Sequence, residues 1–114
     1  MTYATVSMVK RRMRIQATDT GRDADIEAAI TFGDAFCNGA IKANGGGTPV
    51  LIPPTELKEA AADLAAYYLF RSSNPTTASL YYDSGKTLLM NYVSGNLTTF
   101  GVNQSGKSGV RDDE

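Results

Sequence analysis

One stretch near the C-terminus matches the spacing of a nucleotide-binding motif. Residues 101–108 read Gly-Val-Asn-Gln-Ser-Gly-Lys-Ser, a formal match to the phosphate-loop pattern G-x-x-x-x-G-K-[ST]. Such a loop needs a buried strand before it and a helix after it, within an α/β domain. Here six residues follow Ser108 and the rest of the chain has a helical pattern. We therefore interpret the match as coincidence, and a nucleotide-binding enzyme is the least favoured hypothesis.

Other residue types that support catalysis are scarce. The chain has no His and one Cys, Cys37, so Ser-His-Asp triads, Cys-His pairs and His-containing zinc sites lack essential members. Cys37 falls within an apolar helical pattern, which predicts a small buried hydrophobic residue. Asp23, Asp25 and Glu27 stand in the first turn of a predicted helix, where acidic residues complement the helix dipole. We expect no catalytic residue, no metal site and no cofactor.

A cationic cluster at Lys10, Arg11, Arg12 and Arg14 is the remaining candidate for binding. On the predicted short helix Lys10, Arg11 and Arg14 fall opposite an apolar stripe of Val6, Val9 and Met13. The simplest interpretation of the cluster is a solvated helix face. The alternative is contact with an anion, either the phosphates of DNA or an acidic partner surface. Both interpretations stay open at this point.

The overall composition limits the protein class. The chain has 114 residues, of which 42% are hydrophobic and 20% charged, with 11 Lys and Arg against 12 Asp and Glu. These values are typical of one soluble domain rather than a disordered chain. No apolar run is long enough for a membrane helix, and no secretory signal is evident at the N-terminus, so we expect no membrane association. The balanced charge argues against a dedicated nucleic-acid-binding protein.

Helical periodicity extends over most of the chain and predicts an all-α bundle of about four helices. Thr5 is expected to cap the first helix, and a polar loop from Gln16 to Arg22 to end it. Asp23 or a near neighbour should cap the second helix, which runs to about Asn44, where Gly45-Gly46-Gly47 stops it. Residues 49–54 carry prolines at both ends and predict an extended connector that packs on the bundle.

The second half of the chain contains the other two predicted helices. The third opens at Pro54 or Thr55 and runs to about Phe70; the fourth follows Asn74 as cap and Pro75 as first residue, and ends near Gly95. Gly85 lies inside the fourth helix, which should be weakened or closely approached there. We predict a helical domain over residues 1–95 and a flexible polar C-terminal arm over residues 96–114.

The third helix is apolar on almost every side, with Asp63 as the only charge between Glu59 and Arg71. Such a helix is normally buried all round, and we expect a bundle this small to leave part of it for contact with another subunit. The tyrosines of the third and fourth helices lie at helical spacing and are expected to be core and interface residues. The predicted subunit-packing residues are Ala62, Ala66, Tyr67 and Phe70.

Four segments, taken together and in order, resemble the small head-tail connector proteins of tailed phages, also called head completion or adaptor proteins. They are Tyr3-Ala4-Thr5-Val6 leading into Val9-Lys10, the segment 26–30 after an acidic cap, the segment 52–68, and the segment 81–92 with its paired tyrosines. The most specific part is Pro53-Pro54-Thr55-Glu56-Leu57-Lys58-Glu59-Ala60 followed by an Ala-rich helix that ends in Tyr-x-x-x-Arg, at Tyr67 and Arg71. The resemblance covers residues 3 to about 95, and the glycine loop and the polar tail depart from it.

The resemblance implies a structural virion protein rather than an enzyme. It implies a ring of subunits, commonly twelve, that docks under the portal protein, extends the DNA channel, and offers a platform for the next neck or tail-completion protein. Packaged DNA would pass through the lumen without sequence-specific binding. The location would be the virion neck, and the host cytoplasm during assembly.

Within this hypothesis the candidate residues take provisional roles. Lys10, Arg11, Arg12 and Arg14 would line the channel or meet an acidic partner. The C-terminal arm would dock on the portal or on a neighbouring subunit through Leu97, Phe100, Val102 and Arg111. The alternative hypothesis is a small helical nucleic-acid-binding regulator that uses the basic first helix.

Overall fold

Four helices make up the part of the chain that the structure, a computed structural model, describes, which is residues 2–97. They are α1 (Val6–Met13), α2 (Asp23–Ala43), α3 (Thr55–Phe70) and α4 (Pro75–Gly95). Within this range the structure contains no strand, as an all-α prediction requires. None of these helices is both long enough and apolar enough to cross a bilayer.

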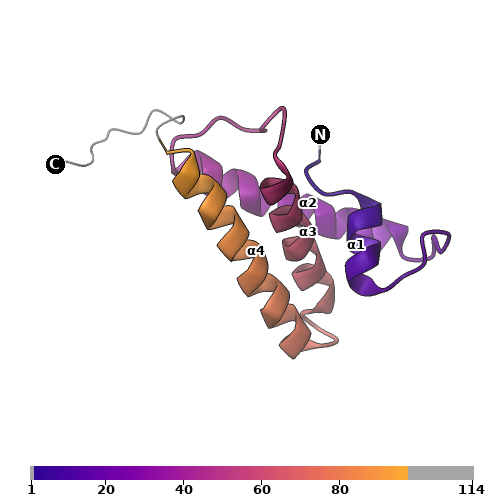
Figure 1. Cartoon of the computed structure of the whole chain (residues 1–114). Coiled ribbons are helices and arrows are strands. Elements are labelled where there is room, and N and C mark those ends of the chain that lie inside the picture. The colour runs from indigo at the N-terminus through magenta and orange to yellow at the C-terminus, as the bar shows by residue number, and fades with distance from the viewer. Residues whose placement is uncertain (1, 98–114) are drawn as a thin grey trace.

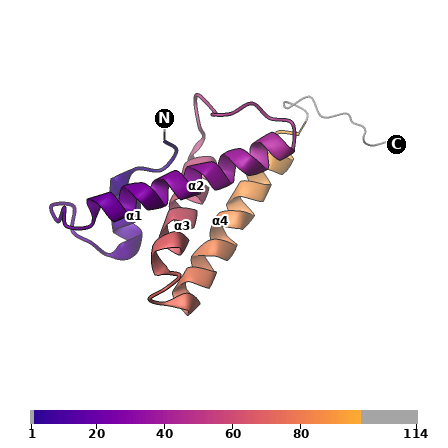
Figure 2. The same ribbon diagram turned by 180° about the vertical axis from the view of Figure 1, so that it is seen from behind.

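α3 and α4 form an antiparallel hairpin, and α2 crosses behind it (Figures 1 and 2). The short turn of residues 71–74 joins α3 to α4 at one end of the hairpin. At the other end, the long connection of residues 44–54 returns the chain from the end of α2 to the start of α3. α1 lies beside α2 and α3, away from α4's C-terminal end. α3 is therefore the central helix, with neighbours on three sides.

Local capping sets two of the helix starts as predicted. The Thr5 hydroxyl accepts a hydrogen bond from the Met8 N–H at 3.2 Å, and the Asn74 side chain accepts one from the Thr77 N–H at 3.2 Å, with Pro75 directly after it. The start of α2 differs from the prediction, because Arg22 occupies the N-cap position and no side chain caps it. Asp23 instead begins the helix and pairs with Lys10 of α1.

Two glycines let α3 approach its neighbours closely. A β-carbon at Gly33 of α2 would stand 2.5 Å from the Ala61 carbonyl oxygen, and one at Gly85 of α4 would stand 3.0 Å from Leu64 Cγ and 3.1 Å from the Ala60 carbonyl oxygen. Real β-carbons do not approach atoms as closely as the first of these distances. Gly85 is thus a point of close approach, and the small residues of α3 form the other half of both contacts.

The core is continuous through all four helices. Its largest fully buried side chains are Tyr3, Ile26, Ile41, Leu57, Leu64, Leu89, Val9 and Cys37. Because α1, α2 and α4 surround α3, every residue from Ala60 to Ala66 is buried. Ala62 and Ala66 have no exposed area at all. The prediction that these two alanines face another subunit is therefore wrong, since the chain's own helices cover them.

The connection between α2 and α3 packs only in part. Val50 is half-buried against the core, and its N–H donates to the Tyr3 hydroxyl at 2.8 Å. Leu51 and Ile52, in contrast, are 75% and 90% exposed. The predicted extended connector thus rests on the bundle at Val50 and turns its two largest apolar side chains to solvent.

Candidate functional site

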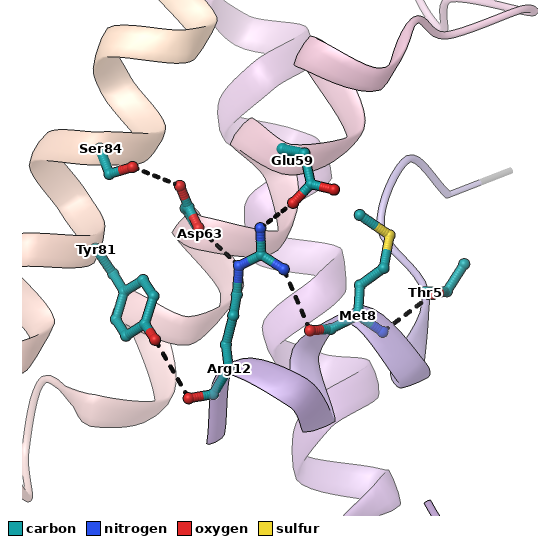
Figure 3. Close-up of polar contacts among 7 residues, drawn as sticks. All are labelled: Thr5, Met8, Arg12, Glu59, Asp63, Tyr81 and Ser84. Carbon is teal, nitrogen blue, oxygen red and sulfur yellow. Dashed lines mark hydrogen bonds and ion pairs between the residues drawn. The ribbon is translucent and has the colours of Figure 1, made fainter. Parts of the chain in front are cut away.

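The guanidinium of Arg12 joins α1 to α3 through two carboxylates (Figure 3). Its Nε donates to Asp63 Oδ1 at 2.7 Å, one terminal nitrogen pairs with Glu59, and the other donates to the Met8 carbonyl oxygen at 3.2 Å. Glu59 and Asp63 are four residues apart on α3, so both point from one face of that helix. All three nitrogens of the guanidinium therefore have partners inside the chain.

The network continues into α4. Ser84 donates its hydroxyl to Asp63 Oδ2 at 2.8 Å, and the Tyr81 hydroxyl donates to the Arg12 backbone carbonyl at 3.2 Å (Figure 3). Each carboxylate oxygen of Asp63 thus accepts one hydrogen bond, from α1 and from α4 respectively. Arg12 and Ser84 bond the Asp63 carboxylate, and Glu59 and Tyr81 bond Arg12 in turn. We call these five residues on three helices the Asp63 network (Arg12, Glu59, Asp63, Tyr81 and Ser84).

The Asp63 network holds one cation and two carboxylates, and its central pair is largely buried. The side chain of Asp63 is 8% exposed and that of Arg12 is 16% exposed. Burial alone would lower the pKa of Arg12, but hydrogen bonds from the guanidinium to Asp63 and Glu59 outweigh it, so the pKa is raised. Arg12 is therefore charged at neutral pH. The network links α1, α3 and α4 and can hold these helices in register.

The predicted cationic cluster divides into two pairs of residues. Lys10 is buried, with its Nζ 3.0 Å from Asp23 Oδ1 and donating to the Ala17 carbonyl oxygen at 3.2 Å. Lys10 and Arg12 therefore bind partners inside the chain rather than solvent, a channel or an acidic partner. The interpretation of the cluster as a solvated helix face is therefore wrong for Lys10 and Arg12. Arg11 and Arg14 are exposed, so they carry the solvent-accessible positive charge of the cluster.

Tyr3 attaches the N-terminal segment to the bundle. Its hydroxyl pairs with Asn38 of α2 and accepts the bond from Val50, while its backbone N–H donates to Asp34 Oδ1 at 3.1 Å. Burial raises the pKa of Asp34, and the backbone N–H groups of Tyr3 and Ala4 oppose that rise. Tyr3 is 2% exposed, so it stabilises the docking of the N-terminal segment on the bundle.

Cys37 is buried and has no cationic neighbour that would stabilise a thiolate. Burial raises the pKa of its thiol to about 12. The thiol is therefore protonated at neutral pH and unreactive, in line with its expected role as a small core residue.

Aromatic side chains gather where α2, α3 and α4 meet. Tyr67 and Tyr82 have ring centroids 5.0 Å apart, and the Arg71 guanidinium lies 4.2 Å from the Tyr68 ring centroid. The Phe70 ring stacks on Tyr81 with centroids 5.8 Å apart. Tyr67 and Phe70, two of the predicted subunit-packing residues, are half-buried and stay accessible to a second molecule.

A groove opens beside these rings at the α3–α4 turn. It has a volume of about 370 Å³, and we call it the aromatic groove; its lining residues are Tyr67, Arg71, Pro75, Ala78, Ser79 and Tyr82. The buried methyl of Ala78 forms part of the wall, whereas Arg71, Pro75 and Ser79 are exposed. No sequence pattern pointed to this groove, because it depends on how two helices meet.

The predicted docking arm lies mostly outside the described residues. Leu97 is inside them and is 37% exposed. Phe100, Val102 and Arg111 lie beyond residue 97, as does the formal phosphate-loop match at residues 101–108. Among residues 2–97, no group of three acidic or Cys side chains is placed to hold a metal ion.

Comparison of the chain with models of protein families, with curated proteins and with solved structures finds no match.

Proposed function

We propose that the chain is a structural subunit of a tailed-phage neck, one copy in a head-tail adaptor ring of about twelve. The ring would dock beneath the portal protein, extend the DNA channel, and present a platform for the next neck or tail-completion protein. It would act without catalysis and without a cofactor, in the virion after assembly in the host cytoplasm.

One observation supports this proposal most: the exposure of Leu51 and Ile52 at 75% and 90%. Two adjacent large apolar side chains on a proline-bounded loop favour burial against another molecule. Each would contribute roughly 1.5–3 kcal/mol if it were fully buried. A protein whose role is to assemble needs such a surface, and the segment 52–68 that follows it carries the resemblance to phage adaptor proteins.

The charges of α1 agree better with a conduit than with a DNA-binding regulator. A regulator that uses this helix would need most of its cations free to neutralise phosphates. Lys10 and Arg12 are engaged by Asp23, Glu59 and Asp63, which leaves Arg11 and Arg14. Two exposed arginines on a short helix are a weak attraction for DNA, and a weak attraction suits a channel through which DNA must pass.

The test is addition of the purified chain to DNA-filled heads of the phage that encodes it, prepared without this protein. Electron microscopy should show a ring of added density beneath the portal, and mass measurement should give a whole number of copies per head. Heads that lack the portal are the control and should gain nothing. A chain that never joins portal-bearing heads contradicts the proposal, and salt-sensitive DNA binding that is lost on Arg11→Ala and Arg14→Ala would favour the regulator instead.

A further inference from the structure

We propose that adjacent copies of this chain join head to tail, with the loop of residues 49–54 of one copy seated in the aromatic groove of the next. This inference rests on the proposed ring, because it names the two surfaces that would form the ring's subunit contact. The partner is a second copy of the chain, and the contact is between two different surfaces rather than one surface with itself.

The loop has the chemistry of a segment that binds in a groove. Its sequence is Pro49-Val50-Leu51-Ile52-Pro53-Pro54, so prolines bound the two exposed apolar side chains on both sides. Proline fixes φ and keeps the chain extended, and Pro-rich extended segments dock in grooves that aromatic side chains line. Leu51 and Ile52 are the two most exposed large apolar residues of the described part of the chain.

The loop is also held in place before any partner arrives. Val50 packs on the core and donates to Tyr3, and Pro54 leads directly into α3, where its carbonyl accepts from the Lys58 N–H at 3.1 Å. A segment fixed at both ends loses little conformational entropy on binding. Leu51 and Ile52 are thus presented on a short, anchored protrusion.

The aromatic groove has the matching chemistry. The rings of Tyr67 and Tyr82 and the methyl of Ala78 offer apolar surface, and Pro75 adds more at the rim. A volume of about 370 Å³ lies within the range of grooves that bind side chains of this size. Arg71, at the edge, can donate to backbone carbonyls of an extended segment.

A single chain cannot make this contact with itself. The loop precedes Thr55 at one end of α3, whereas the groove begins at Tyr67, near the other end (Figure 1). The 12 residues of helix between them span about 18 Å at 1.5 Å per residue. Because Val50 and Pro54 anchor the loop, it cannot reach back to its own groove. The loop therefore needs a groove outside its own chain, and the matching apolar surfaces favour the same groove on a second copy. Such a head-to-tail contact closes into a ring if its rotation allows.

The test uses two exposed substitutions, one on each surface. Ile52→Asp places a charge on the loop, and Ser79→Arg fills the groove; neither site is in the core, so circular dichroism and thermal unfolding should match the unchanged chain. Sedimentation of the purified protein over a range of concentrations should show self-association that each variant weakens by about tenfold or more. Leu80→Asp is the matched control, since Leu80 is 67% exposed but lines neither surface, and it should associate normally.

Mixing the two variants gives the most specific result. The Ile52→Asp chain keeps its groove and the Ser79→Arg chain keeps its loop, so an equal mixture should form a one-to-one dimer and nothing larger. A reciprocal two-fold contact would also give this dimer, but it would stop the unchanged chain at a dimer, whereas a head-to-tail contact lets the unchanged chain form larger assemblies. Absence of the mixed dimer, or an unchanged chain that stops at a dimer, overturns the proposal. An unchanged chain that stays monomeric at every concentration overturns it too, as does equal weakening by Leu80→Asp.

Disulfide trapping provides an independent geometric test. Ile52→Cys and Ser79→Cys chains, mixed under mild oxidation, should form a crossed disulfide faster than Ile52→Cys with Leu80→Cys; Cys37 is buried and does not compete. Equal rates for the two mixtures contradict the proposed contact.

The outcome separates this inference from the proposed function. Self-association through the loop and groove by a chain that never joins portal-bearing heads would retain the contact and remove the adaptor role. Variants that join portal-bearing heads in full copy number would retain the adaptor role and remove the contact.

Discussion

α1 and α4 are both attached to α3, but by opposite means. α1 is held largely by charge and hydrogen bonding, through the Arg12 guanidinium on Glu59 and Asp63, with Val9 as its one fully buried apolar side chain. α4 is held by close packing, in which Gly85 lies against the backbone and side chains of α3. A buried ion pair specifies one geometry while contributing little net stability, because desolvation offsets the attraction. Close packing of helices contributes stability directly through dispersion and apolar burial.

The ion-paired helix α1 and the packed helices α2, α3 and α4 therefore have different structural roles. The packing of α2 and α4 on α3 supplies the stable body that carries both proposed docking surfaces. The Asp63 network fixes the position of α1, and with it the two exposed arginines, relative to that body. We therefore expect that loss of the Asp63 network releases α1 first, while the packed body of α2, α3 and α4 stays folded.

Removing the cation of the Asp63 network tests whether α1 is held on α3 mainly by charge, and we expect this change to have the largest effect. Arg12→Ala leaves Asp63 buried beside Glu59 without a positive charge, which should lower the free energy of unfolding by about 3 kcal/mol. Hydrogen exchange should rise most for the amides of α1, because undocking of that helix lets water reach the carboxylates. Denaturant unfolding and amide exchange measure the two effects.

Arg11→Ala is the matched control, one residue earlier on the same helix and exposed. It should change the free energy of unfolding by no more than about 0.5 kcal/mol. Equal losses in the two variants would contradict a specific role for the Asp63 network.

A methyl group at the closest helix contact tests the packed body. Gly33→Ala would place a β-carbon 2.5 Å from the Ala61 carbonyl oxygen, so α2 and α3 must move apart. We expect a net loss of about 2 kcal/mol in the free energy of unfolding, despite the higher helix propensity of alanine. Unlike Arg12→Ala, this change should raise hydrogen exchange in α2 and α3.

Gly39→Ala on the same helix is the control for propensity. Apart from the local backbone of α2, nothing lies within 4 Å of the added β-carbon, so the substitution should stabilise by about 0.5–1 kcal/mol. A stabilising effect of Gly33→Ala would show that the α2–α3 contact can relax, and would contradict the contrast between the two regions.

The same contrast explains what the sequence could and could not predict. Helix starts at Thr5 and Asn74 follow from local chemistry, and the structure has both where they were predicted. The partners of Arg12 follow from tertiary packing, 47 and 51 residues along the chain, which no local pattern encodes. One signal was present: Asp63 is a lone charge in an apolar helix, and a buried carboxylate requires a cation or hydrogen-bond donors.

The lone charge at Asp63 also bears on the prediction that part of α3 faces another subunit. A carboxylate that needs a cation predicts that some other element covers that face of α3, and the structure shows that this element is α1 of the same chain. The exposed Leu51 and Ile52 show the converse. An apolar run bounded by prolines predicts burial, but it does not say whether the covering surface belongs to the same molecule.

We expect the smallest change in the free energy of unfolding at Asp34. Its carboxylate accepts hydrogen bonds from the backbone N–H groups of Tyr3 and Ala4. Burial raises its pKa above the ordinary 3.8, so the folded state binds a proton more tightly than the unfolded chain. The contribution of Asp34 to stability is therefore greatest below pH 3.8 and falls as the pH rises through the folded pKa.

Asp34→Asn keeps a carbonyl oxygen that accepts from the Tyr3 N–H, and it removes the titrating group. Its free energy of unfolding should therefore lack this decline, with a difference of a few tenths of a kcal/mol at neutral pH. Parallel denaturant titrations of the two chains across acidic pH measure the difference in slope. A steeper decline in Asp34→Asn would mean that the anchoring hydrogen bond needs the charged carboxylate, and the N-terminal segment would then join α1 as a region held by charge.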